Sequence, residues 1–409
     1  MVGVWPDNRH QAAVLRLLRD GGPRSRAELV DAVGLSRSKL AVEIDRLIDR
    51  GLVDTAGPAA SRGGRRSSVV RIAAATRYLG IDIGASTLDL AVTDGEMRLL
   101  GRVNERTDLR KGPTAVIGQA LEMINKLRVE TGTTRFTGAG VGIPGPVSFR
   151  EGMPVSPPFM PGWHRFPVRE TLAAELSCPV LVDNDVNIMA LGEMHSGIAR
   201  SFEDFLFVKI GAGIGCGIVA AGEVYRGATG SAGDIGHTSV DPHGPVCVCG
   251  NTGCLEAFFG GAALTRDALT AARSGRSPHL AERLREAGTV TPVDVSVAAA
   301  DGDPFAMNLV RDGARRVGQV LAGLVSFFNP GLIVIGGGVA GIGHALLAEI
   351  RSVVYRKSLP LATGDMPIAL SEMGDEAGLV GAARMISDHI CHDQSVHSAP
   401  TRPEAFAAH

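Results

Sequence analysis

The chain has 409 residues, of which 45% are hydrophobic and 21% charged, a composition that fits a soluble globular protein of two or three domains. No apolar run reaches about 18 residues, so a membrane span is not expected. The net charge of −2 divides into about +5 over residues 1–75 and about −7 over the remainder, so one end of the molecule is expected to meet a polyanion.

The N-terminus lacks the pattern of a secretory signal, because MVGVWPDNRHQ has no basic segment followed by an apolar run. Six cysteines in a chain of this length exclude a disulfide scaffold. Without an export signal the thiols should stay reduced, and we expect a cytoplasmic protein.

Three short helices are predicted near the N-terminus. HQAAVLRLLRDGG (10–22) has the apolar spacing of an amphipathic helix and ends in glycine. SRAELVDAVG (25–34) begins with Ser25, which is expected to cap the helix as part of a capping box. After a tight turn, Ser36 can cap a third helix, RSKLAVEIDRLID (37–49). This order is typical of a helix-turn-helix.

Two strand-like runs follow in residues 51–72, separated by a loop rich in Gly, Ser and Arg, as in a winged helix. Side chains at the start of the third helix and on the loop tip could therefore reach base edges, phosphates or a minor groove. The candidate DNA-binding residues are Arg37, Ser38, Lys39, Arg62, Arg65 and Arg66. A helical protein-interaction module with solvated arginines is the alternative interpretation.

From residue 78 onward the chain repeats units of strand, glycine turn and strand. Backbone amides exposed in such turns can bind phosphates, although no GxxxxGK[ST] sequence is present. Their recurrence predicts a duplicated α/β body with a cleft between two lobes. The units are YLGIDIGASTLDLAVTD (78–94), VGIPGPVS (141–148), FLFVKIGAGIGCGIVAAGEVYRG (205–227) and LIVIGGGVAG (332–341).

One histidine and three cysteines have the spacing of metal ligands. His237, Cys247, Cys249 and Cys254 follow the pattern His-x9-Cys-x-Cys-x4-Cys, which supplies the ligand set of a closed, tetrahedral zinc site. Four protein ligands leave no open position, so the predicted role of the zinc is structural. An incidental cluster of free cysteines is the alternative.

The stretch AGDIGHTSVDPHGPVCVCGNTGCLE (232–256) resembles the signature of the ROK family of repressors, open reading frames and kinases. The N-terminal segment resembles the winged helix of the repressor branch, and residues 78–390 resemble the sugar-kinase body. The resemblance implies an α/β fold in which a winged helix-turn-helix precedes a two-lobed, actin-like (RNase H-like) body.

Four regions are expected on this basis. They are a DNA-binding domain (1–75), a first lobe (76–190), a second lobe with the zinc loop and closing helix (191–390), and a disordered tail (391–409).

The resemblance also implies roles for individual residues. The sugar-binding residues would be Asn184, Asp185, Asp234, His237 and Glu256, with Asp185 as general base if the chain is an active kinase. The nucleotide and phosphate loops would include Asp82, Gly84, Gly211, Gly213, Gly336 and Gly337. ATP and Mg²⁺ would be bound only by an active kinase.

Several positions depart from the pattern of the kinases. Phe159 stands where a sugar-binding Asn is usual, and Asp234 stands where Glu is common. Ala85 and Ala212 occupy the two phosphate turns, and at the second turn a hydroxyl is lost; a lost hydrogen bond to a phosphate costs about 1.5–3 kcal/mol. Phosphoryl transfer is therefore expected to be weakened while the sugar cleft persists.

These features predict a sugar-responsive DNA-binding transcriptional regulator, a repressor, that works as a homodimer or homotetramer with operator DNA and a sugar or sugar-phosphate effector. An active ATP-dependent hexose kinase with a DNA-binding arm is the second hypothesis. A zinc-stabilised scaffold that binds neither sugar nor ATP is the third.

Overall fold

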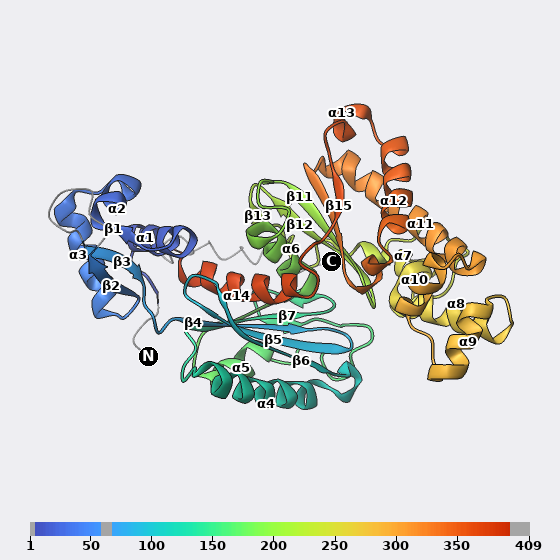
Figure 1. The fold of residues 1–409 in the computed structure, drawn as a ribbon, viewed down its shortest axis with the longest axis horizontal. Coiled ribbons are helices and arrows are strands. Elements are labelled where there is room, and N and C mark those ends of the chain that lie inside the picture. The colour runs from blue at the N-terminus through green and yellow to red at the C-terminus, as the bar shows by residue number, and fades with distance from the viewer. Residues whose placement is uncertain (1–4, 59–67, 393–409) are drawn as a thin grey trace, which may run out of the picture.

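The computed structural model describes residues 5–58 and 68–392. The candidate wing residues Arg62, Arg65 and Arg66, and positions 393–409 of the tail, lie outside the described residues. The described chain forms a small N-terminal unit beside a larger body that contains two five-stranded sheets (Figure 1). The predicted α/β architecture of a winged helix followed by a two-lobed body is confirmed. None of the described helices combines the length and the apolar character needed to cross a bilayer.

The N-terminal unit contains the three predicted helices and an antiparallel sheet in the order β1-β3-β2. Ser25 accepts a hydrogen bond from the backbone of Glu28 in the expected capping box, and Ser36 caps the third helix through the backbone N–H of Lys39. Leu18, Ile44 and other apolar side chains of the helices form a buried core with the sheet. The elements are α1 (Arg9–Gly21), β1 (Arg24–Ser25), α2 (Arg26–Val33), α3 (Arg37–Asp49), β2 (Val53–Pro58) and β3 (Ser68–Ile72).

The first sheet of the body has the order β10-β7-β4-β5-β6, with parallel pairs at β10-β7-β4 and antiparallel pairs at β4-β5-β6. In Figure 1 helices α4 and α5 lie below this sheet and α14 lies above it. The strands are β4 (Arg77–Ile83), β5 (Thr87–Asp94), β6 (Leu99–Arg106), β7 (Gly138–Ile143) and β10 (Val180–Asn184), and the helices are α4 (Pro113–Thr131), α5 (Val168–Leu176), α6 (Asp185–Ser196) and α14 (Glu376–Ile390). A short hairpin, β8 (Val147–Ser148) with β9 (Met153–Pro154), follows β7.

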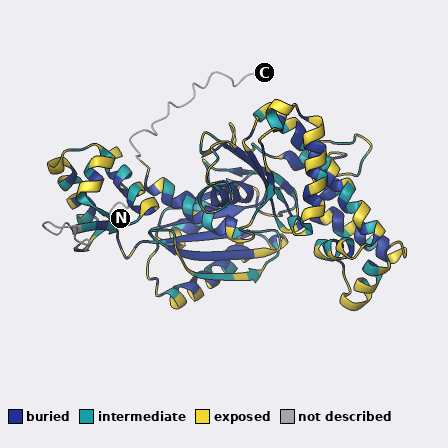
Figure 2. Cartoon of the chain, turned by 45° about the horizontal axis from the view of Figure 1, so that its top comes forward, coloured by how far each residue is buried: buried dark blue, intermediate teal, exposed yellow. Residues whose placement is uncertain are grey.

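The second sheet has the order β13-β12-β11-β14-β15 and mixes antiparallel and parallel pairs in the same way. Its outer helices keep an exposed face, whereas the strands are largely buried (Figure 2). The strands are β11 (Phe205–Ile210), β12 (Ile214–Ala220), β13 (Glu223–Val224), β14 (Leu332–Gly336) and β15 (Ile368–Leu370). The helices are α7 (Leu255–Phe259), α8 (Gly261–Arg273), α9 (Pro278–Ala287), α10 (Pro292–Ala300), α11 (Pro304–Phe328), α12 (His344–Lys357) and α13 (Pro360–Thr363), with short 3₁₀ turns at Leu109–Lys111, Ile235–His237 and Gly338–Ile342.

Helices α6 and α14 pack closely against each other where the two lobes meet. Glycines bring their backbones together, since a Cβ on Gly381 would lie 1.7 Å from the carbonyl oxygen of Ile188, and one on Gly192 would lie 2.1 Å from that of Ala377. The expected boundary at residue 190 therefore falls inside α6. The closing helix α14 was expected with the second lobe, but it lies against β4 and β7 of the first sheet. Apolar side chains of α14 cover an apolar face of that sheet.

Candidate functional site

A cleft of about 810 Å³ lies between the two lobes. Turns at the ends of strands from both sheets line it, as expected for an open α/β sheet, where ligands bind beyond the carboxyl ends of the strands. The cleft contains the following residues that the sequence singles out: Asp82, Gly84, Asn184, Asp185, Gly211, Gly213, Asp234, His237, Glu256 and Gly337. Gly336 is not among the lining residues; it lies at the end of β14, where a Cβ would come 2.5 Å from the ring of Phe207.

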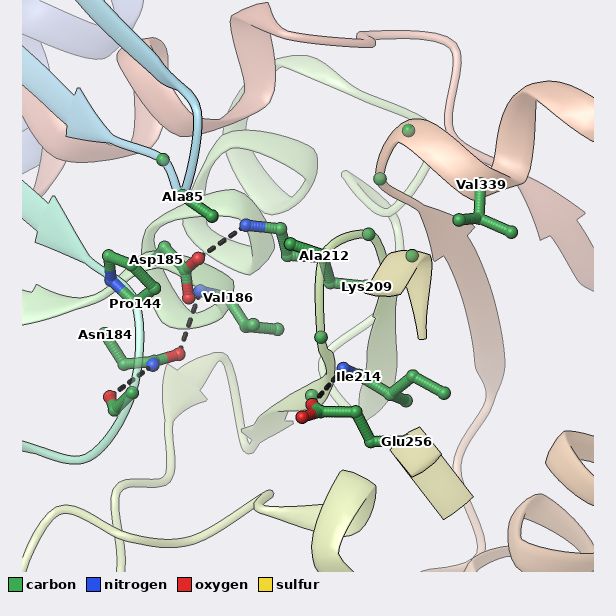
Figure 3. A pocket seen from close by; sticks show the side chains of 18 of the residues that line it. Ala85, Pro144, Asn184, Asp185, Val186, Lys209, Ala212, Ile214, Glu256 and Val339 are labelled. Carbon is green, nitrogen blue, oxygen red and sulfur yellow. Dashed lines mark hydrogen bonds and ion pairs between the residues drawn. The ribbon is translucent and has the colours of Figure 1, made fainter. Parts of the chain in front are cut away.

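Asn184 and Asp185 lie at the junction of β10 and α6. The side chain of Asn184 caps α6 by accepting a hydrogen bond from the backbone N–H of Val186 at 2.9 Å, and it donates one to the carbonyl oxygen of Gly145 at 2.8 Å. Asp185 is 4% exposed, and one of its carboxylate oxygens lies 2.5 Å from the Nζ atom of Lys209 (Figure 3). The side chains at this edge of the cleft are thus held in place by hydrogen bonds and by an ion pair with the second lobe.

Glu256 faces them from the second lobe. Its carboxylate accepts a hydrogen bond from the backbone N–H of Ile214 at 3.0 Å, which Figure 3 shows. Gly213 leaves room for this carboxylate, because a Cβ there would lie 2.4 Å from Oε2. Burial raises the pKa of Glu256 above its usual value, although the Ile214 N–H and nearby His237 act in the opposite direction. The hydrogen bond from Ile214 and the space left by Gly213 thus hold the carboxyl group at the wall of the cleft.

The four predicted metal ligands come together beside the cleft. The ligand atoms of His237, Cys247, Cys249 and Cys254 all lie within 4.8 Å of one another. Cys249 Sγ is 3.7 Å from Cys254 Sγ, and Cys247 Sγ is 3.5 Å from His237 Nδ1. Two sulfurs bound to one tetrahedral metal at about 2.3 Å lie roughly 3.8 Å apart, so the cluster fits a metal ion. Cys254 directly precedes α7, which begins one residue before Glu256.

The glycine turns form hairpin connections at the cleft. In the first turn the N–H of Gly84 donates to the carbonyl oxygen of Thr87 at 2.8 Å. In the second, the N–H of Gly211 donates to Gly213, and the Gly211 carbonyl accepts from the N–H of Gly261 at the start of α8. The second turn is thereby fixed to the N-terminus of a helix.

Asp82, near the end of β4, is an acid whose surroundings disfavour its ionised form. Its Oδ1 atom is buried and has no hydrogen-bond partner among the described residues. Burial raises the pKa of Asp82 to about 7; Lys209 opposes this shift, and Asp185 adds to it.

Lys209 was not identified from the sequence as a site residue, although its position in an apolar strand could have indicated one. It is a charged residue in a strand, FLFVKI, whose other residues are buried. Such a lysine needs a buried acid as partner, and the sequence offered several acids without indicating which one lies opposite.

The candidate DNA-contacting residues Arg37, Ser38 and Lys39 lie in the first turn of α3 and are exposed. The Ser38 hydroxyl lies 3.2 Å from that of Ser36. The first turn of α3 is thus free to contact a partner.

An ionic network centred on the buried Arg19 joins the N-terminal unit to the body. Arg19 of α1, whose side chain is 1% exposed, lies 2.8 Å from Asp388 of α14 and 3.2 Å from the hydroxyl of Ser387. Arg384 of α14 binds Asp20 of α1 at 2.7 Å. Burial alone would raise the pKa of Asp388, but His195, Arg19 and Arg384 lower it to about 2. Sequence reasoning missed this junction, because the paired residues are more than 360 positions apart.

Comparisons with known proteins agree with this architecture. Residues 78–389 match the sequence profile of the ROK family. The chain belongs to the ROK family. The xylose repressor of Caldicellulosiruptor bescii is 26% identical over 376 residues, which cover 91% of this chain and 94% of the relative.

Two solved ROK structures are similar to different extents of the chain. A ROK family transcriptional regulator, a homologue of the E. coli MLC protein, superposes with a TM-score of 0.78 at 25% identity and covers 93% of this chain and 96% of its own. A ROK family glucokinase from Streptomyces griseus, in complex with glucose and AMPPNP, has a TM-score of 0.66 at 29% identity and covers 76% of this chain and 98% of its own. The glucokinase covers a smaller share of the chain than the regulator does.

The positions where this ROK chain departs from the kinase pattern also lie at the cleft. Ala85, Phe159, Ala212 and Asp234 all line it. Phe159 packs in addition against the core of the first lobe. An apolar ring thus stands in the wall of the cleft.

Proposed function

We propose that this ROK protein is a sugar-responsive transcriptional repressor. The observation that carries the proposal is the joining of a winged helix to a polar interlobe cleft in one chain. Similarity to a xylose repressor and to a solved transcriptional regulator extends over more than 90% of the chain, whereas similarity to the glucokinase covers 76%. On this proposal, residues 1–75 bind DNA and the two lobes of the body bind the effector.

The sugar would be held between the acids of the two lobes. Asp185 and Glu256 offer carboxylate oxygens on opposite walls, and Asn184, Asp234 and His237 add further polar groups. Several fixed donors and acceptors that converge on a ring of hydroxyls are what selective sugar binding requires. Gly84, Gly211, Gly213 and Gly337 would then line the side of the cleft on which a kinase binds nucleotide.

The metal would be zinc. Three thiolates and one imidazole with the observed spacing suit Zn²⁺ better than the oxygen-preferring cations. His237 uses Nδ1 toward Cys247, which leaves its second ring nitrogen for the cleft. The metal would order the loop that leads into Glu256, so its role is structural.

Operator DNA would be bound by Arg37, Ser38 and Lys39 of α3, with Arg62, Arg65 and Arg66 as candidates from the wing. The exposure of the first turn of α3 supports the first three. These residue types supply the phosphate and base-edge contacts of a helix in a major groove.

Helix α6 offers a direct route from effector to DNA. It begins at Asp185 in the cleft, and near its other end His195 lies 3.5 Å from Asp388, the partner of Arg19. A shift of α6 on effector binding would therefore act on the α1–α14 junction, which carries the winged helix. Allosteric coupling needs such an element with differential contacts in two states.

A homodimer, or a tetramer built from it, would let two winged helices read two half-sites. Apolar side chains exposed on the outer helices of the second lobe support self-association. Phe327 at the end of α11 is 89% exposed, and Leu359 and Leu361 at α13 are 75% and 98% exposed. Exposed apolar groups gathered on one side of a protein mark interaction surfaces.

The test is DNA binding with and without sugars. Genomic fragments bound by the protein are selected, and their affinity is measured by fluorescence anisotropy across a panel of sugars and sugar phosphates. Asp185→Asn should abolish the response to the active sugar while leaving DNA affinity unchanged. Lys39→Ala should weaken DNA binding while leaving sugar binding, measured by calorimetry, intact. A protein that binds no DNA fragment specifically would contradict the proposal.

The ATP-dependent kinase is the other candidate, because Asp82 and Asp185 are both present in the cleft. It predicts phosphorylation of a hexose by ATP, with loss of turnover in Asp185→Asn. Turnover without any effect of sugar on DNA affinity would favour the kinase over the repressor.

A further inference from the structure

Lys209 lies beside the carboxylate of Asp185 in the cleft. It is the fifth of the six residues of β11, and its side chain is 20% exposed, while that of Asp185 is 6% exposed. Nζ lies 2.5 Å from Asp185 Oδ2, the separation of a close ion pair. Figure 3 shows the side chain reaching from β11 of the second lobe to the start of α6.

The carboxyl group of Asp82 also interacts electrostatically with Lys209. Burial alone would lower the pKa of Lys209, but Asp185 and Asp82 raise it above its usual value, so the ammonium stays charged. Gly378 of α14 lies against Asp82, since a Cβ there would be 2.0 Å from Oδ2. The nearby Asp89 is paired with Arg102 at 3.0 Å, so it has a cation of its own.

Phosphoryl transfer from a nucleotide needs a divalent cation and a free carboxylate base. A magnesium ion takes oxygen ligands at about 2.0–2.1 Å in near-octahedral geometry. An ammonium in contact with Asp185 fills the volume beside that oxygen and repels a second cation. It also occupies Oδ2 of Asp185, an oxygen that a base would use to accept the proton. The residues at this place therefore do not fit a nucleotide-bound metal.

We propose that Lys209 is a built-in cation that takes the place of a divalent metal between Asp82 and Asp185. The cleft then binds its ligand without metal, and the ligand leaves chemically unchanged. This inference deepens the proposed function and rests on the cleft as an effector site. In it, Lys209 is the residue that allows the cleft to bind a ligand but prevents phosphoryl transfer.

The test is direct measurement of Mn²⁺ binding by electron paramagnetic resonance, on protein already loaded with zinc. The wild-type protein is expected to bind no Mn²⁺ in the cleft at millimolar concentration. Lys209→Ala removes the positive charge and should bind Mn²⁺ at least about tenfold more tightly, because the interaction of unit charges a few ångströms apart near a protein surface exceeds 1.4 kcal/mol. Lys209→Ala/Asp82→Asn should lose most of this gain.

A matched pair of variants keeps the test valid if Lys209→Ala folds poorly. Lys209→Met removes the charge but keeps most of the length of the side chain. The double variant Lys209→Met/Asp185→Asn also removes the unpaired acid. The double variant should therefore keep the fold and bind no Mn²⁺. Equal Mn²⁺ affinity in the wild-type protein and in both Lys209 variants would overturn the proposal. Because Mn²⁺ binding is measured without DNA or sugar, this result is separate from failure of the repressor assay.

Discussion

Arg19 of the winged helix and Asp388 of the last helix of the body form an ion pair, with 2.8 Å between Nη1 and Oδ1; Arg19 is buried and the side chain of Asp388 is 37% exposed. The N-terminal unit and the body are joined here, next to His195 near the end of α6. Arg19→Ala should lower the free energy of unfolding by about 1–3 kcal/mol, because charged hydrogen bonds are lost. The effect of sugar on DNA affinity should also fall toward none, while each ligand still binds.

Chemical denaturation and anisotropy titrations with and without effector measure these two effects. Arg16→Ala is the matched control, since Arg16 lies on the same helix and is exposed. An Arg19→Ala protein with a full effector response would exclude the junction from the coupling route.

The close contact of α6 and α14 makes a second prediction. Gly381→Ala would place a methyl group 1.7 Å from the Ile188 carbonyl oxygen, so the helices must separate. Overpacking of this kind costs about 1–3 kcal/mol. Gly323→Ala is the control, because nothing lies within 4 Å of a Cβ there, in α11, and alanine should raise helix stability by up to about 1 kcal/mol. Melting temperatures that shift in the same direction for both variants would contradict this packing.

Removal of the metal should disable the cleft. Cys249→Ser, or treatment with a strong chelator, is expected to reduce bound zinc from about one ion per chain to near zero. Sugar binding should weaken, since Glu256 follows directly from the metal loop. Mass-spectrometric metal analysis and calorimetry provide the readouts. Cys178→Ser serves as control, because Cys178 is buried in the first lobe, outside the cluster. Stoichiometric zinc in Cys249→Ser would remove that ligand from the site.

Asp82 should give the protein a characteristic dependence on pH. Its pKa is raised from 3.8 to about 7 in the folded state, so between these values the folded protein holds a proton that the unfolded chain has lost. Stability from this group is therefore present at low pH and is lost as the pH rises from about 4 to 7. Asp388, with its pKa lowered to about 2, adds stability as the pH rises to about 5 and contributes no slope above that value.

Asp82→Asn should flatten the fall in melting temperature between pH 4 and pH 7 and raise stability at pH 7, by up to a few kcal/mol. Denaturant titrations at several pH values test this. An unchanged slope in the variant would mean that Asp82 is ionised throughout.

The exposed apolar side chains of α11 and α13 should govern self-association. Phe327→Asp/Leu361→Asp is expected to yield monomers in light-scattering measurements, because charges on the surface oppose burial of both copies. Val129→Asp is the control, since Val129 is 86% exposed on α4 of the first lobe. An unchanged molar mass in the double variant would place the interface elsewhere.

Local patterns were sufficient for the secondary structure that positions the sites. Ser25, Ser36 and the apolar spacing of the first three helices predict their ends, because caps and amphipathic faces are local properties. The spacing of His237 and the three cysteines likewise predicts a metal cluster, since its ligands lie within 18 residues of one another. Glycine turns after apolar strands predict a cleft between two lobes.

Long-range partners could be decided only by the tertiary structure. The sequence does not indicate that Lys209 opposes Asp185, that Oδ1 of Asp82 is buried without a hydrogen-bond partner among the described residues, or that Arg19 meets Asp388. Each of these acids and bases has many possible partners along the chain, and only the packing of β11, α6 and α14 selects one. The sequence by itself determines which groups are available and which elements carry them. Their charges and pairings depend on burial, which exists only once the lobes have come together.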